Sequence, residues 1–111
     1  MSNMMKINNV AAKVFYDADI DMFRGEFIGL NGGADFYADN VHALRQEGEK
    51  SLQVFLEMCA EKGLEPYKHY SGKFNLRIKP ELHKRISIKA SAEDKSINAW
   101  VADKLEAELQ A

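Results

Sequence analysis

The chain has 111 residues, of which 46% are hydrophobic and 29% charged, and its formal net charge is −2. This composition excludes a disordered chain, and no apolar run approaches the roughly 20 residues of a membrane span. Cys59 is the single cysteine, which excludes an intramolecular disulfide, and residues 1–5 lack the basic-then-apolar order of a signal peptide, so we expect a cytoplasmic protein.

The charge is distributed unevenly along the chain. Residues 1–70 hold seven Lys or Arg against eleven Asp or Glu, a net −4, whereas residues 71–111 hold eight against six, a net +2. Such asymmetry between halves favours one part that faces nucleic acid and another that is engaged differently.

The first half predicts an α+β layer. Residues 10–16 and 22–28 are rich in β-branched and aromatic side chains and predict two strands joined by a turn at 17–21, and residues 34–38 predict a short third strand. Asn40 is a good N-cap for a helix of about 22 residues that ends before Gly63. Its apolar stripe recurs every three or four residues: Val41, Leu44, Gly48, Leu52, Phe55 and Cys59.

Neither a metal site nor a catalytic site is predicted, and no cofactor is expected. Asp17, Asp19 and Asp21 alternate as in the first half of a calcium loop, but Met22 and Ile28 stand where such a loop needs Gly and Glu, so a solvated acidic turn is the better interpretation. Three histidines are scattered without ligand or base partners at suitable spacing: His42, His69 and His83.

Residues 73–78 alternate between polar and apolar side chains, the pattern of a strand with two unlike faces. The apolar face carries Phe74, Leu76 and Ile78, and the polar face carries Lys73, Asn75 and Arg77. Lys and Arg pair with guanine and Asn pairs with adenine in the DNA major groove, so the polar face suits base reading by a two-stranded ribbon. The alternative is an ordinary strand whose polar face is solvated.

Two helices are expected after this strand. Pro80 suits the first turn of a helix, and that helix should end near Glu93 and Asp94, with Asp94 in the left-handed conformation. Ser96 is a strong N-cap for a second helix, whose first N–H groups at Ser96, Ile97 and Asn98 would bind a DNA phosphate. On the first helix, Lys84 and Lys89 are further candidates for phosphate contacts.

A strand and two helices in about 37 residues cannot bury a core of their own, and a lone strand leaves an unpaired edge. Both problems disappear if two copies pair their strands antiparallel and intertwine their helices. We therefore expect a homodimer, and assembly of two dimers into a tetramer stays open. The shared core would consist of Phe74, Leu76, Ile78, Leu82, Ile86, Trp100, Val101 and Leu105.

Residues 74–77, Pro80 and residues 96–98 together resemble the ribbon-helix-helix (Arc/MetJ-type) fold of bacterial repressors. More closely, residues 70–78 followed by 80–83 resemble the HicB family of antitoxins, and the likeness extends upstream to about residue 10 through Glu57–Gly63, Phe15–Asp17 and Gly29–Leu30. The sequence departs from this family in two places: Phe36–Asn40 replaces a Phe-x-Gly-x-Ser segment, and Asp94 replaces a glycine before the last helix.

The resemblance implies a partial ribonuclease-H-like domain without catalytic function at residues 1–65, a linker at 66–72 and a ribbon-helix-helix domain at 73–111. The first domain would bind a small HicA-type toxin, a ribonuclease that resembles a double-stranded-RNA-binding domain, and the second would repress the operon promoter. A toxin that holds RNA must be basic, so these carboxylates are candidates for its binding: Asp17, Asp19, Asp21, Glu26 and Asp35. The alternative is a ribbon-helix-helix regulator whose first domain binds another ligand or only drives oligomerisation.

Overall fold

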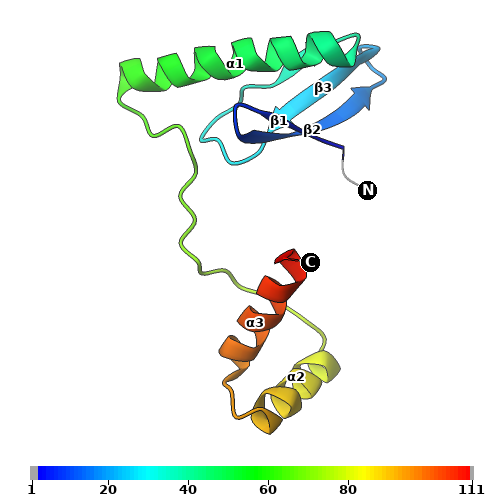
Figure 1. Ribbon diagram of the computed structural model, residues 1–111, viewed down its shortest axis with the longest axis vertical. Coiled ribbons are helices and arrows are strands. Elements are labelled where there is room, and N and C mark those ends of the chain that lie inside the picture. Colours follow the sequence, from blue (N-terminus) through cyan, green and yellow to red (C-terminus); the bar gives the residue numbers. More distant parts are fainter. Residues whose placement is uncertain (1–2, 111) are drawn as a thin grey trace. The chain divides into compact units, whose positions relative to one another are not determined.

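In the computed structural model, which describes residues 3–110, the chain divides into two units, Met1–Ser71 and Gly72–Ala111. The first unit holds an antiparallel four-stranded sheet and one long helix, and the second holds two helices (Figure 1). The predicted α+β class is confirmed. Within residues 3–110 no helix is both long and apolar enough to cross a membrane.

The sheet runs in the order β1-β2-β3-β4, formed by Met4–Ile7, Val10–Asp17, Met22–Phe27 and Phe36–Ala38. The predicted strands at 10–16 and 22–28 agree with β2 and β3 within one residue, and the third predicted strand shortens to β4. The sequence did not predict β1. The sequence feature that could have indicated β1 is the pair Asn8 and Asn9. Both residues have positive φ (49° and 69°), and together they close a two-residue hairpin between β1 and β2.

The helix α1, Val41–Lys62, lies across one face of this sheet (Figure 1). The Asn40 side chain accepts a hydrogen bond from the Ala43 N–H (2.8 Å), and Gly63 adopts the left-handed conformation, so both predicted caps are confirmed. The predicted stripe is buried from Leu44 to Cys59. Val41 in the first turn is the exception, with 56% of its surface exposed.

Phe36 on β4 packs between two glycines. A Cβ on Gly25 of β3 would lie 2.1 Å from the Phe36 ring, and a Cβ on Gly48 of α1 would lie 2.2 Å from Ile7 Cδ1 and 2.9 Å from the Phe36 ring. Phe36 and Ile7 are 3% and 2% exposed, so neither can move into solvent. The two glycines therefore let the helix approach the sheet closely.

Part of the predicted linker is bonded to the first unit. The Asn31 side-chain amide donates to the carbonyls of Glu65 (2.9 Å) and Tyr67 (3.0 Å), and the Lys68 N–H donates to the Gly29 carbonyl (2.9 Å). These bonds hold residues 65–68 against the loop that follows β3.

The second unit contains α2, Pro80–Ala92, and α3, Ile97–Gln110. Pro80 is in the first turn of α2, Asp94 has φ = 55°, and the Ser96 hydroxyl accepts from the Ala99 N–H (3.0 Å), as the sequence predicts. Residues 73–79 form no strand in the single chain, because a strand requires a hydrogen-bonded neighbour. Of residues 72–110 only Ala90 is buried.

Trp100 joins α3 to the end of α2. Its indole N–H donates to the Glu93 carboxylate (3.0 Å), and Lys104 Nζ lies 5.2 Å from the centre of the ring. The hydrogen bond from Trp100, followed by the nearby lysines, lowers the pKa of Glu93. Trp100, which the sequence assigns to a shared core, thus already has contacts within its own chain.

We predict that Gly48→Ala destabilises the first unit. Alanine favours a helix by about 1 kcal/mol over glycine, but the overpacking against Ile7 and Phe36 costs about 1–3 kcal/mol, so the net effect should be destabilising. Urea unfolding would measure the change in the free energy of unfolding. Gly33→Ala is the matched control, because nothing lies within 4 Å of its Cβ. Equal stability of the two variants would contradict the close packing.

We predict that Trp100 fluorescence titrates at a pH below the usual glutamate range, which centres near about 4.3. Because the folded pKa of Glu93 is lowered, the bond from Trp100 contributes stability above the ordinary pKa and loses it as the pH falls through the lowered value. Trp100 is the only tryptophan, so its emission reports this site. Glu93→Gln should remove the transition and Glu106→Gln should retain it; a transition that persists in Glu93→Gln would contradict the assignment.

Candidate binding surfaces

The segment before α2 presents both faces of the predicted ribbon to solvent. Lys73, Asn75 and Arg77 are exposed, as expected for base-reading side chains. Phe74 and Leu76, on the other face, are 75% and 64% exposed. Apolar side chains exposed to this extent in a contiguous segment mark a surface that another molecule covers.

The helices of the second unit form a hollow that continues this apolar face. It has a volume of about 280 Å³ and is lined by Leu76, Ile78, His83, Ile86, Ile97, Asn98 and Val101. Four of the predicted core residues therefore lie together: Leu76, Ile78, Ile86 and Val101. Leu82 and Leu105 are 44% and 47% exposed, and they do not line the hollow.

The predicted phosphate contacts lie on exposed positions of α2 and at the start of α3. Ile97 and Asn98 are the first two residues of α3, where backbone N–H groups have no partner within the helix. The Ser96 hydroxyl accepts a hydrogen bond from the Ala99 N–H and caps the helix. This hydroxyl therefore stabilises the first turn of α3 and is already used in a bond within the chain. Lys84 and Lys89 are exposed on α2.

The five predicted acidic residues separate into two groups. Asp17, Asp19 and Asp21 lie at the β2–β3 hairpin, where Asp17 accepts from the Asp19 N–H (3.0 Å) and Asp21 accepts from the Tyr16 hydroxyl. The bond to Asp21 raises the pKa of Tyr16. This group stays exposed to solvent except for Asp17, which is half-buried.

Arg24 organises the second acidic group. Its guanidinium contacts Asp35 (2.6 Å) and Glu26 (3.3 Å), and the bond to Asp35 raises the pKa of Arg24. It also lies over the rings of Phe15 and Tyr37, 5.8 and 5.6 Å from their centres, on the sheet face away from α1. Glu26 and Asp35 are thus already partnered. Sequence reasoning missed Arg24, although Arg24 and Glu26 alternate on one strand.

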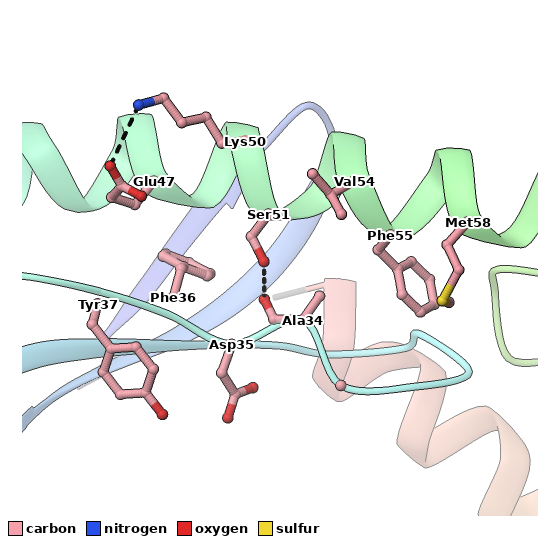
Figure 2. A pocket seen from close by; sticks show the side chains of 11 residues that line it. Ala34, Asp35, Phe36, Tyr37, Glu47, Lys50, Ser51, Val54, Phe55 and Met58 are labelled. Carbon is pink, nitrogen blue, oxygen red and sulfur yellow. Dashed lines mark hydrogen bonds and ion pairs between the residues drawn. The ribbon is translucent and has the colours of Figure 1, made fainter.

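A groove that the sequence did not predict runs between β4 and α1 (Figure 2). We call it the β4 groove. Its volume is about 500 Å³, and its lining residues are Gly33, Ala34, Asp35, Phe36, Tyr37, Glu47, Lys50, Ser51, Val54, Phe55 and Met58. The Ser51 hydroxyl donates to the Ala34 carbonyl (2.8 Å) and joins the helix to the strand side.

Cys59 is buried within the core, so its thiol is shielded from solvent. Among residues 3–110 no group of three or more His, Cys, Asp or Glu side chains is placed to hold a metal ion.

The HicB family model matches residues 55–105, a little under half of the chain. A search of curated proteins and a search of solved structures gave no match. The matched region runs from the last two turns of α1 through the predicted ribbon and α2 into α3. It includes Lys73, Asn75 and Arg77 but not the five acidic residues, and the resemblance noted at Phe15–Asp17 and Gly29–Leu30 lies outside it.

HicB is a family of antitoxins from toxin–antitoxin systems and is not known as a family of enzymes. The match supports the resemblance drawn from residues 57–63 and 70–83. From the end of α1 to α3, this chain is similar to the HicB family of antitoxins.

Proposed function

We propose that the chain is an antitoxin that binds a HicA-type RNA-cleaving toxin and represses its own operon. The observation that carries this proposal is the HicB match over residues 55–105. The charges of the two units support a division of labour, because residues 1–71 carry a net −4 and residues 72–111 a net +2. Neutralisation would belong to the acidic unit and DNA binding to the basic one, in the cytoplasm.

For the second unit we propose a ribbon-helix-helix dimer. A unit with Ala90 as its one buried residue among positions 72–110 lacks a core of its own. Pairing residues 73–78 with a second copy would satisfy the strand and cover Phe74 and Leu76, while the hollow between α2 and α3 would receive apolar side chains of the other chain. Burial of these side chains would supply the stability that the single chain lacks.

The same dimer would present its polar ribbon face to the major groove. Lys73, Asn75 and Arg77 from each chain would contact base edges, and the first N–H groups of α3 would position a phosphate on each side. Lys84 and Lys89 would add contacts to phosphates that carry no sequence information.

For the first unit we propose a partial ribonuclease-H-like domain that binds the toxin. Its antiparallel sheet with α1 on one face is the architecture on which this proposal rests. The hairpin carboxylates Asp17, Asp19 and Asp21 are the better candidates for steering a basic toxin, because Glu26 and Asp35 already bind Arg24. A toxin contact with the latter pair would have to compete with that guanidinium.

We predict that Asn75→Ala and Arg77→Ala each cost about 1–3 kcal/mol of binding to the operon's own promoter and relax its sequence preference, because each removes a contact to a base edge. Gel-shift titration against specific and scrambled DNA would measure both effects.

Lys84→Ala and Lys89→Ala should instead weaken binding to all DNA alike and reduce its salt dependence. Sedimentation would verify that every variant has the assembly of the wild type. Undiminished specific affinity in Asn75→Ala and Arg77→Ala would exclude them as base readers.

We predict that replacing Asp17, Asp19 and Asp21 together by Asn slows association with a HicA-type toxin about tenfold or more at low salt, since steering depends on these charges. Stopped-flow mixing at two salt concentrations would measure the rate. The matched control neutralises three exposed carboxylates of the second unit, with Glu81→Gln, Glu106→Gln and Glu108→Gln. Equal rates for both triple variants would rule out the hairpin. A wild-type chain that binds the promoter but not this toxin would favour the regulator alternative.

A further inference from the structure

β4 is an edge strand with an open side. The Ile28 N–H donates to the Ala11 carbonyl (2.9 Å), so the even-numbered residues of β3 bond to β2 and the odd-numbered ones face β4. Phe36 and Ala38 are the register partners of those odd residues, so their backbone groups point to β3. The N–H and carbonyl of Tyr37 therefore point away from the sheet.

The opposite edge of the sheet is bonded at one outward group. On β1 the outward carbonyl of Lys6 accepts a hydrogen bond from Arg45 of α1 (3.0 Å). Within residues 3–110 no comparable bond covers the backbone of Tyr37. An unpaired strand edge with its hydrogen-bonding groups available is a template for another strand.

The β4 groove lies beside this open edge. Figure 2 shows Phe36 directed to α1, whereas Tyr37 and Asp35 point away from it. Phe55 and Phe36 are buried in the core beneath the groove, and Val54 on the helix side is 65% exposed. A strand added to β4 would place alternate side chains on the helix side, where this groove offers an apolar wall.

The charges beside the groove favour a cationic occupant. Asp35 and Glu47 line the groove, and Asp39 directly follows β4. Lys50, the one cation among the lining residues, pairs with Glu47 (3.5 Å), and Arg24 pairs with Asp35 (2.6 Å). Within residues 3–110 no cation pairs with Asp39, so Asp39 is the carboxylate that a cationic segment could bind without displacing a basic side chain. A second copy fits less well, because antiparallel self-pairing centred on Tyr37 would place Asp35 opposite Asp39, and like charges directly opposite are destabilising.

We propose that the β4 groove binds an extended, cationic segment of the partner toxin, which adds as a fifth strand to β4 and inserts an apolar side chain beside Val54. This inference rests on the proposed antitoxin function and assigns the surface that performs it. Backbone pairing would supply affinity, and the Val54 wall with the bordering carboxylates would supply selectivity.

Two variants of the full-length chain test this surface. Tyr37→Pro removes the outward N–H and retains the bonds between β4 and β3, because proline is tolerated where the N–H faces away from the sheet. Val54→Lys fills the groove and adds a positive charge at a largely exposed position. The matched controls are Tyr37→Ala, which retains the N–H, and Gln53→Lys, which adds the same charge one residue away at an exposed position that does not line the groove.

Calorimetric titration with a HicA-type toxin would give the Kd of each variant. We expect Tyr37→Pro and Val54→Lys to weaken binding about ten- to hundredfold, since each removes a backbone bond or the apolar contact, and the controls to remain within about threefold of wild type. Thermal melts would confirm that the variants are folded. If Tyr37→Pro does not fold, the Kd of Val54→Lys alone tests the proposal.

The outcomes are distinguishable. A wild-type chain that binds no such toxin would overturn the antitoxin function together with the groove assignment. Wild-type binding that both variants retain would overturn the groove assignment alone. If Val54→Lys left toxin binding intact but reduced the assembly of the wild type from tetramer to dimer, the occupant would be a second copy, and the proposed strand addition by the toxin would be wrong.

Discussion

The unequal burial of apolar surface is the constraint on which this molecule depends. Among residues 3–110, eleven of the twelve buried hydrophobic residues form one cluster in the first unit, and only Ala90 belongs to the second. Since removal of apolar surface from water is the main favourable contribution to folding, the two units differ in how much of this contribution a single chain supplies. The first has a core that includes Leu44, Leu52 and Phe36, whereas the second buries only Ala90 among residues 72–110, and the proposed dimer would complete its core.

The two units also present two unfinished sheet edges. Residues 73–78 belong to no strand of the single chain, and β4 has a neighbouring strand on one side only. Proteins usually protect such edges, and in this chain Arg45 bonds one outward carbonyl of β1, that of Lys6. Edges left open beside apolar side chains are consistent with binding by strand pairing. In the proposals above, the second unit pairs with a second copy of the chain, and the first unit pairs with a partner protein.

Electrostatics distinguish the partners that these edges would accept. The net negative charge of the first unit would favour a basic protein over nucleic acid, while the basic residues around α2 would favour phosphate. Arg24 limits this simple division, because it neutralises Glu26 and Asp35 on the open face of the sheet. Asp17, Asp19 and Asp21 at the β2–β3 hairpin and Asp39 after β4 are not paired with Arg24.

The local sequence by itself determined the helices, their ends and their caps. Asn40, Gly63, Asp94 and Ser96 act within four residues of their own positions, so their roles can be read from neighbouring residues. The alternation of residues 73–78 and the resemblance around it indicated the proposed DNA-reading surface in the same way. Only tertiary structure decided the pairing of β1, the ion pairs of Arg24 and the β4 groove. Each depends on strand register and on helix placement that bring distant residues together, as with Ser51 and Ala34, and no local pattern encodes those distances.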